Sequence, residues 1–473
     1  MIDINVTHLL NEMSDRRWFS RRDSAPTSAH VLDQILVDDG PPPLVLTLIE
    51  VVFEDGYRDL YHVPLLIEED GGARDAFDEP RRLGVLGGLL ADGHPLPGAK
   101  GSVQFGGPGL DPLAPPGTRS VRAMGVEQTN SSCVFDEAII LKLFRRVQEG
   151  PNPDIELTRS LTNAGFPHIP AHVGELTYVG TPHGETAEIR LDLGIAQRFI
   201  AEGSEGWDAT LRRLNVLFDE VDPADAHEDM RVLTEERAVG ILGAIDQLGD
   251  ATASLHVALS RDEDELNPEP VEPADLKEWT DQVRTMLTRL VASGVSELAE
   301  VEEAVAARIE ALSGVTEPGL KIRVHGDYHL GQVLHSSRGW MILDFEGEPA
   351  RSVEERRHKH SPLKDVAGML RSFGYAAMSA LFQRGEPGGR EWERLEPWAN
   401  MWETLARERF LHSYFRKSHE GRFLPADRDE ATVMLDFFEI DKALYEIGYE
   451  SSHRPEWLRI PVRGIHRLLD QSS

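Results

Sequence analysis

Cysteine is almost absent from this chain. Its 473 residues include one cysteine, Cys133, so no disulfide can form within the chain. Small disulfide-stapled folds are therefore excluded, and the composition is typical of a protein that works in a reducing cytoplasm. We accordingly expect a cytoplasmic location and a core that is held together by packing alone.

Long apolar runs and positive charge are also scarce. No segment approaches the length that crosses a bilayer, and the first residues, MIDINVTHLLNEMSDRR, are interrupted by charges in a way that does not fit a signal peptide. Lysine and arginine number 49 against 81 acidic residues, a formal net charge of −32. This balance argues against a nucleic-acid or anionic-membrane partner, because either would need a basic face.

Length and pattern predict three regions. Residues 1–118 would form a small N-terminal α+β cap, with a hairpin of two strands at 43–53 and 57–69 and a glycine- and proline-rich linker, 95–117, at its end. Residues 119–203 carry strand patterns, and residues 204–473 carry mostly helical periodicity. The helices expected from this periodicity cover 207–221, 230–259, 274–312, 392–418 and 427–450, with one more starting at Pro362.

The chain is organised around the stretch VHGDYHLGQVLHSSRGWMILDFE, residues 324–346. Asp327 follows a short apolar strand, and Gln332 comes five positions later. A turn at 336–339 then leads into a second apolar strand, which ends on Asp344. Two carboxylates and one amide are thus expected at one edge of a small sheet.

This arrangement suits phosphoryl transfer. A kinase needs a carboxylate that receives the hydroxyl proton and oxygen ligands for the Mg²⁺ that bridges the ATP phosphates. The pattern H-G-D-x-x-x-x-Q followed by D-F-E parallels the kinase pattern H-R-D-x-x-x-x-N followed by D-F-G. We therefore assign Asp327 as the catalytic base and Gln332 and Asp344 as the metal ligands.

Two other interpretations of the stretch remain open. His325, Asp327 and His329 alternate, so on a strand they would face one way and could hold a transition metal. That arrangement leaves Gln332 and Asp344 unexplained. Alternatively, the stretch is a buried polar turn that only satisfies backbone groups.

The same stretch resembles the aminoglycoside phosphotransferase and choline kinase group, and more closely the bacterial maltokinases. The resemblance rests on HGDYHLGQVL, ILDFEGEPARSVEER, SPLKDVAGMLRSFGYAA and DKALYEIGYESSHRPEWLRIP. It implies a bilobal protein-kinase-like α+β fold with an N-terminal cap and a large helical C-terminal lobe. It also implies ATP and Mg²⁺ as cofactors, maltose 1-phosphate as product, a role in glycogen (α-glucan) synthesis from trehalose, and a trehalose synthase partner.

Three alternatives to a maltokinase are kept. The first is a glucosamine kinase, because such enzymes look like maltokinases overall and a cationic acceptor would suit an acidic pocket. The second is a catalytically silent kinase-like scaffold, although the presence of the site residues together speaks against it. The third is a histidine-based metallohydrolase, which would need bound Zn²⁺ or Mn²⁺.

The nucleotide site is predicted between residues 121 and 200. Lys142 lies inside an apolar strand, where an ammonium needs a negative partner such as ATP phosphate. The helix expected at 153–161 carries Glu156, which would pair with that lysine as in protein kinases. The polar turn at 128–132 would cover the phosphates, and the end of a later strand would bind adenine. The corresponding residues are Gln128, Ser131, Gln197 and Phe199.

The acceptor site is predicted from the second half of the chain. The face of the C-terminal helix carries Lys442, Tyr445 and Glu446 within about one and a half turns, and so combines polar groups with an aromatic plane. His325 and Arg351 complete the predicted substrate set. Asp365 is assigned a structural role in bracing the catalytic loop. His256 is interpreted as a core or supporting histidine rather than a ligand.

Overall fold

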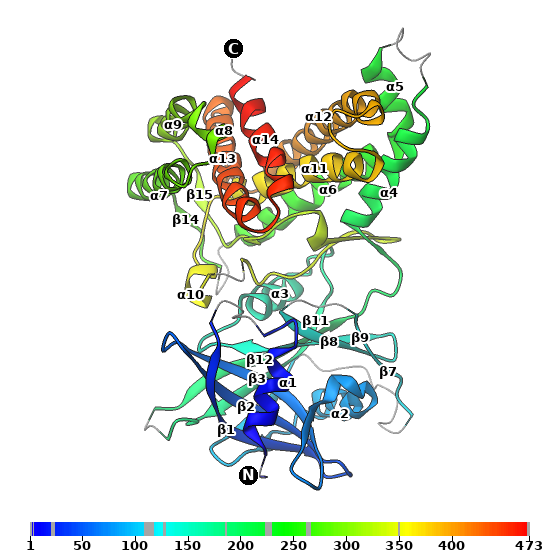
Figure 1. Ribbon diagram of the computed structural model, residues 1–473, viewed down its shortest axis with the longest axis vertical. Helices are drawn as coiled ribbons and strands as arrows, with labels where there is room; N and C mark the ends of the chain where they lie inside the picture. The colour runs from blue at the N-terminus through cyan, green and yellow to red at the C-terminus, as the bar shows by residue number, and fades with distance from the viewer. Residues whose placement is uncertain are drawn as a thin grey trace. The chain divides into compact units, whose positions relative to one another are not determined.

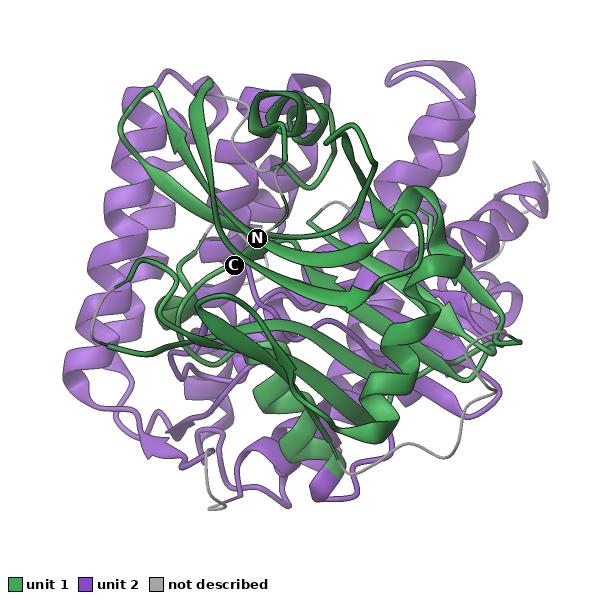
Figure 2. Cartoon of the chain, turned by 90° about the horizontal axis from the view of Figure 1, so that it is seen from below, with its two compact units in different colours: residues 1–162, 170–201, 351–355 green, residues 163–169, 202–350, 356–473 purple. Residues whose placement is uncertain are grey.

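The computed structural model describes residues 2, 4–19, 24–107, 118–125, 129–184, 187–222, 229–261, 266–348 and 351–470. Contacts group the chain into two compact units (Figures 1 and 2). Unit 1 comprises Met1–Thr162, Pro170–Ala201 and Arg351–Glu355, and unit 2 comprises Asn163–Ile169, Glu202–Ala350 and Arg356–Ser473. The predicted separation of a cap, 1–118, from a small lobe, 119–203, remains a prediction.

The first sheet of unit 1 is built from hairpin-connected strands. Its order is β1-β2-β3-β10, with β4 paired to β3. The apolar run of β2 is buried almost throughout, because helix α1 covers one face with Leu9 and Met13 while a second apolar cluster lies on the other. The elements are α1 (Val6–Ser14), β1 (Pro26–Asp38), β2 (Leu44–Phe53), β3 (Arg58–Ile67), β4 (Ala73–Asp75) and β10 (Arg146–Val147).

Sequence analysis found the β2–β3 hairpin but missed β1. The predicted strands 43–53 and 57–69 correspond to β2 and β3, which pair antiparallel. The polar segment that becomes β1 has no clean alternation of apolar and polar residues, since its burial changes along its length and its register shifts three times. Pairing with β2, rather than local pattern, makes it a strand.

The second sheet of unit 1 has seven strands in the order β5-β6-β11-β12-β9-β8-β7. Part of the segment predicted as a linker, 95–117, is in fact strand, because Val103 and Phe105 turn inward into the core of the sheet. Gly101 allows this, since a Cβ there would lie 2.5 Å from the Tyr178 ring. The strands are β5 (Leu96–Pro97), β6 (Gly101–Gly106), β7 (Val121–Ala123), β8 (Asn130–Phe135), β9 (Ile139–Phe144), β11 (His172–Gly180) and β12 (Ile189–Arg198).

His62 makes the stability of unit 1 depend on pH. Its ring is fully buried, with Nδ1 3.3 Å from the Phe144 carbonyl. Burial, together with the nearby Arg145 guanidinium, lowers the pKa of His62 from 6.5 to about 3. The folded pKa therefore lies below the unfolded one. Stability is fully present above pH 6.5 and is lost as the pH falls toward about 3, because the unfolded chain binds the proton more readily.

We expect His62→Gln to remove this acid sensitivity. One proton of difference corresponds to ~1.4 kcal/mol per pH unit. The unfolded histidine is half protonated at pH 6.5, so between pH 6.5 and 5 the wild type should lose ~1.6 kcal/mol more unfolding free energy than His62→Gln loses. Urea unfolding at both pH values measures it, with the exposed His412→Gln as the matched control. Equal pH dependence of wild type and His62→Gln would contradict the expectation.

Unit 2 is mostly helical around two short sheets. Helix α12 packs along α6, and α11 lies between α12 and α13. Gly249 permits the close approach of α6 to α12, since a Cβ there would meet the Phe410 carbonyl oxygen at 2.5 Å. The longer helices are α4 (Gly206–Asp219), α5 (Met230–Arg237), α6 (Val239–Leu259), α7 (Pro273–Ala292), α9 (Glu302–Ala311), α11 (Leu363–Arg384), α12 (Arg390–Ser418), α13 (Arg428–His453) and α14 (Arg459–Asp470).

The helices expected from periodicity are confirmed, with two of them subdivided. The predicted helix 230–259 is two helices, α5 and α6, and the predicted helix 274–312 is α7, α8 (Ser296–Ala299) and α9. Smaller elements complete the chain: β13 (Ser204–Glu205), β14 (Glu269–Pro270), β15 (Leu320–Lys321), β16 (Val333–Ser336), β17 (Gly339–Ile342), α2 (Gly84–Asp92), α3 (Pro153–Asn163) and α10 (Val353–Arg356). Among the described residues, no helix combines the length and apolarity that a membrane crossing requires.

Candidate active site

The organising stretch forms a loop and a hairpin in unit 2. After the loop, a single 3₁₀ turn, Leu330–Gln332, leads into β16, which pairs antiparallel with β17. The N–H of Leu343 donates to the carbonyl of Gln332 at 2.9 Å, so both ends of the hairpin lie side by side. This confirms the hairpin that the sequence predicted, and it places Gln332 next to Asp344.

The two residues predicted as metal ligands, Asp344 and Gln332, contact each other. The Gln332 Nε2 donates to Asp344 Oδ2 at 3.1 Å. Asp344 has a φ of +64°, a left-handed conformation that Asp tolerates better than most residues. Glu346, which sequence analysis did not assign, has a carboxylate oxygen within 4.8 Å of one from Asp344. Carboxylate and amide oxygens are the donors that Mg²⁺ prefers, so these residues fit such an ion.

Asp327 lies in the loop before the hairpin, facing two basic side chains. Its Oδ1 is 3.3 Å from Lys442 Nζ and its Oδ2 is 3.8 Å from His329 Nε2. Burial by itself would raise the pKa of Asp327, but His329 and Lys442 outweigh it and hold the pKa well below its usual range. Asp327 is therefore a carboxylate at neutral pH, which is the form that accepts a hydrogen bond from a hydroxyl group.

Asp365, at the start of α11, fixes the backbone of this loop. Its two oxygens accept the N–H groups of His325 at 2.7 Å and Gly326 at 2.9 Å. Burial disfavours its charge, but His256 Nε2 at 3.2 Å and the loop N–H groups hold the pKa of Asp365 below its usual value. The structural role predicted for Asp365 is confirmed, as is the assignment of His256 to a supporting position.

His325, predicted to contact substrate, is engaged by the protein itself, and its substrate contact stays a prediction. The residue is 1% exposed, and its Nε2 lies 2.8 Å from the Leu343 carbonyl oxygen. Its Nδ1 faces the Asp327 N–H at 3.4 Å, and its ring packs between Tyr328 and Phe345. His325 thus ties the loop to the hairpin, and little of its surface remains for a ligand. The sequence pattern located the residue but could not reveal this burial.

Helix α13 brings Lys442 to the catalytic loop. Besides Asp327, its Nζ lies 3.4 Å from Glu348 Oε1. Burial opposes the positive charge, yet Asp327, Glu348 and Glu446 raise the pKa of Lys442 above its ordinary value. The ammonium also lies 5.0 Å from the centre of the Tyr445 ring, and Tyr445 is 40% exposed. An aromatic face and several carboxylates therefore gather beside Asp327.

Glu446 has a structural partner. Its Oε2 accepts from Arg371 Nε at 3.0 Å and Nη2 at 2.6 Å, and both residues are buried. A sugar contact by Glu446 remains a prediction, but the ion pair is what the contacts establish. Sequence spacing placed Glu446 on the same part of the helix as Lys442 and Tyr445. It did not reveal that Arg371 of α11 lies opposite Glu446.

We expect Glu446→Gln to destabilise the protein by about 3 kcal/mol, because it leaves the Arg371 guanidinium buried without a counter-charge. Urea unfolding measures the loss. The double variant Arg371→Met/Glu446→Leu removes both charges and should recover most of it. A single variant as stable as the wild type would show that the pair contributes little.

Unit 1 contains the predicted nucleotide-binding lysine. Lys142 Nζ, on β9, lies 3.1 Å from Asp154 Oδ2 in the first turn of α3. The carboxylate seen at the ammonium is thus Asp154, two positions before the predicted Glu156, whose pairing stays a prediction. Glu156 was predicted by analogy with kinases. The contact of Asp154 with Lys142 depends on how α3 meets the sheet.

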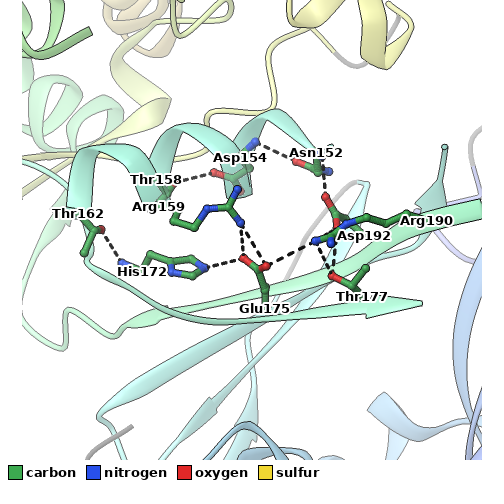
Figure 3. Close-up of polar contacts among 10 residues, drawn as sticks. All are labelled: Asn152, Asp154, Thr158, Arg159, Thr162, His172, Glu175, Thr177, Arg190 and Asp192. Atoms are coloured by element: carbon green, nitrogen blue, oxygen red, sulfur yellow. Dashed lines mark hydrogen bonds and ion pairs between the residues drawn. The ribbon is translucent and has the colours of Figure 1, made fainter. Parts of the chain in front are cut away.

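Figure 3 shows what fixes α3 against this sheet. Arg159 donates to Glu175 of β11 at 2.9 Å, and His172 Nε2 lies 3.3 Å from the same carboxylate. At the start of the helix, the Asn152 N–H donates to Asp192 of β12 at 2.8 Å. The Asn152 side chain accepts the Asp154 N–H at 2.9 Å. These contacts hold the first turn, and hence the Asp154 carboxylate, in place.

The other residues predicted to bind the nucleotide make contacts with the protein that neither support nor contradict a nucleotide contact. Ser131 lies in β8 rather than in a turn, and its hydroxyl accepts from Arg145 Nε at 2.8 Å. Gln197 pairs with Ile140 in the sheet, and the Phe199 N–H donates to the Ala138 carbonyl. Their nucleotide contacts stay predictions. Gln128 lies outside the described residues, and Arg351 is an exposed residue of unit 1 whose role also stays a prediction.

The fold and the loop–hairpin site define a kinase-like phosphotransferase architecture. Structural comparison agrees: a glucosamine kinase solved in complex with glucosamine, ADP and inorganic phosphate aligns with a TM-score of 0.68, covering 99% of this chain and 100% of the other at 21% identity. The bilobal kinase-like fold predicted from sequence is therefore confirmed.

Comparisons of the amino-acid sequence indicate which phosphotransferases this chain resembles. Residues 216–398, which include Asp327, Gln332 and Asp344, match the phosphotransferase enzyme family (APH). This chain is 26% identical to a glucosamine kinase of Mycolicibacterium smegmatis, over 75% of this chain and 81% of that protein. It is 27% identical to a glucosamine kinase of Streptacidiphilus jiangxiensis, over 74% of each. These matches support a phosphotransferase of sugars and favour the glucosamine alternative over the maltokinase prediction.

Proposed function

We propose that this protein transfers the γ-phosphoryl group of ATP to a hydroxyl group of glucosamine. The observation that carries the proposal is the similarity to two glucosamine kinases along about three quarters of the chain, combined with a loop that holds Asp327 as a carboxylate. Maltose, which the motifs HGDYHLGQVL and DKALYEIGYE favour, is the second candidate acceptor.

In the proposed reaction, the acceptor hydroxyl donates its hydrogen bond to Asp327. The hydroxyl oxygen then bonds to the γ-phosphorus while the bond to the β,γ-bridging oxygen breaks, and ADP leaves. The hydroxyl proton passes to Asp327. A carboxylate with a lowered pKa is a weak base, which suits a loose transition state in which the proton moves late. Positioning of the hydroxyl is then the main contribution of Asp327.

Gln332 and Asp344 would hold Mg²⁺, with Glu346 as an additional ligand. When bound, the ion supplies charge neutralisation for the phosphates. Lys142, held by Asp154 at 3.1 Å, would bind phosphate oxygens. In this proposal the Asp154 carboxylate keeps the ammonium in place within its strand.

The charges beside Asp327 support a cationic acceptor. Asp327, Glu348 and Glu446 are the carboxylates that act on the Lys442 ammonium. An amino sugar whose hydroxyl contacts Asp327 could place its ammonium near the same carboxylates, whereas maltose offers no charge for them. Tyr445 would stack on the apolar face of either sugar.

The deciding experiment measures ATP consumption with Mg²⁺ against glucosamine, maltose, glucose and no sugar. Turnover with glucosamine but not maltose is expected. Turnover with maltose alone would move the function to the second candidate. No turnover with any sugar would overturn the proposal. Asp327→Asn, run in parallel, separates enzymatic turnover from contaminating ATPase activity.

A further inference from the structure

A second candidate binding site lies in unit 2, at the end of α12 and the start of α13. The cavity there has a volume of about 400 Å³, within the usual range for small-molecule pockets. No carboxylate lines it among the described residues. The larger side chains that line the cavity are those of Phe415, His419, Arg422, Leu424, Pro425 and Arg428.

Two arginines that line this pocket are exposed to solvent, so their guanidinium groups are open to a ligand. Arg422 and Arg428 make no ion pair or side-chain hydrogen bond within the described part of the chain, although the protein carries a net charge of −32. Three of the four neighbouring carboxylates are engaged elsewhere, and the fourth, Asp429, is exposed on α13. Glu420 binds Lys417 at 2.7 Å, Asp427 caps the first turn of α13, and Glu430 accepts the Thr316 hydroxyl at 2.7 Å.

Much of the remaining wall is apolar. The Arg428 guanidinium lies 5.7 Å from the centre of the Phe415 ring, a cation–π contact that orients its donors. Leu424 and Pro425 add apolar surface. Arg422 has a φ of +52°, an uncommon conformation for a non-glycine residue, and such outliers gather at functional sites. Two guanidinium groups, each able to donate two parallel hydrogen bonds, lie beside an aromatic ring. These groups match the chemistry of a phosphate monoester that is attached to a ring.

The pocket is joined to the catalytic loop by buried contacts. Phe423, between two lining residues, meets the His256 ring edge-on at 6.0 Å. Tyr414, next to Phe415 on α12, has its hydroxyl 2.8 Å from His256 Nδ1. His256 in turn binds Asp365, which holds the backbone N–H groups of the catalytic loop. The 422–424 segment and the loop that carries Asp327 thus share one contact network.

We propose that this pocket binds a ring-bearing phosphate monoester and that its occupancy alters turnover through Phe423, His256 and Asp365. The binding part stands apart from the proposed function. The effect on turnover rests on the proposed function.

Calorimetric titration with phenyl phosphate tests the binding part. We expect one site in the wild type and a dissociation constant at least about 10-fold higher in Arg422→Gln/Arg428→Gln, because two charge-assisted contacts are lost. The control is Arg212→Gln/Arg213→Gln, which removes two exposed arginines from α4 and should leave binding unchanged. Absent binding in the wild type, unchanged binding in the pocket variant, or equal loss in the control would each overturn the site.

Turnover with and without saturating phenyl phosphate tests the coupling. We expect the rate to change at least about twofold in the wild type and not in Arg422→Gln/Arg428→Gln, whose rate without phenyl phosphate stays normal. Calorimetric binding with no change in rate would overturn the coupling. If the protein proved inactive toward every sugar, calorimetry would still decide whether the site exists, so the two failures are distinguishable.

Discussion

Asp327→Asn should lower kcat by at least about 100-fold while the protein folds normally. The amide keeps the shape of the side chain but has no charge with which to position the acceptor hydroxyl and cannot receive its proton, and together these losses amount to at least this factor. The amide also lacks the charge that faces Lys442 Nζ at 3.3 Å. Lys442 retains Glu348 at 3.4 Å as a carboxylate neighbour, so the melting temperature should change little.

The measurement is steady-state turnover with the active acceptor, alongside thermal unfolding. Asp208→Asn, an exposed position on α4, is the matched control and should behave as wild type. A near-normal kcat in Asp327→Asn would refute the assignment of Asp327. A large loss of kcat with normal folding and normal nucleotide binding would place the defect in the chemical step.

Asp344→Ala should abolish Mg²⁺-dependent use of ATP. The carboxylate is the charged member of the predicted ligand pair, and it contacts Gln332 through a 3.1 Å hydrogen bond. Its loss removes one anionic ligand and also releases the second ligand from its orientation. The expected result is loss of measurable turnover at every Mg²⁺ concentration, together with loss of Mg²⁺-dependent nucleotide binding.

The backbone at Asp344 demands a second variant. With a φ of +64°, alanine would add strain of about 1–2 kcal/mol, which could mimic a loss of metal. Asp344→Asn avoids this, because asparagine tolerates the left-handed region. Both variants should lose activity if the carboxylate matters. Unchanged Mg²⁺ dependence in Asp344→Asn would contradict the metal assignment.

Much of the fold could be predicted from local pattern. Apolar periodicity located the long helices, and the D-x-x-x-x-Q spacing followed by an apolar strand located the loop–hairpin unit. Local pattern did not predict the strands that form only because they pair with a distant segment. Strand β1 lacks alternation and exists because β2 pairs with it, and β6 lies in a glycine-rich stretch that looks like a linker.

The contacts of the candidate site also fall into those that local sequence predicts and those that depend on packing between elements. Gln332 and Asp344 are close in sequence, so their contact followed from one hairpin, and Asp327 lies in the loop just before it. Lys442 and Asp327 are 115 residues apart, and their contact depends on how α13 packs. The contact of Lys142 with Asp154 and the burial of His325 likewise depend on contacts between elements, for which the sequence carries no local signal.

The sequence by itself determined the kind of chemistry: a carboxylate, an amide and a second carboxylate at kinase spacing, in a chain with one cysteine and a large negative charge. Only the tertiary structure decided the charges around them. It set Lys442 and Glu348 beside Asp327, occupied Glu446 with Arg371, and left two arginines in a separate pocket. The physical reason is that electrostatic contacts depend on distance in space, which helix and strand periodicity constrain only within one element.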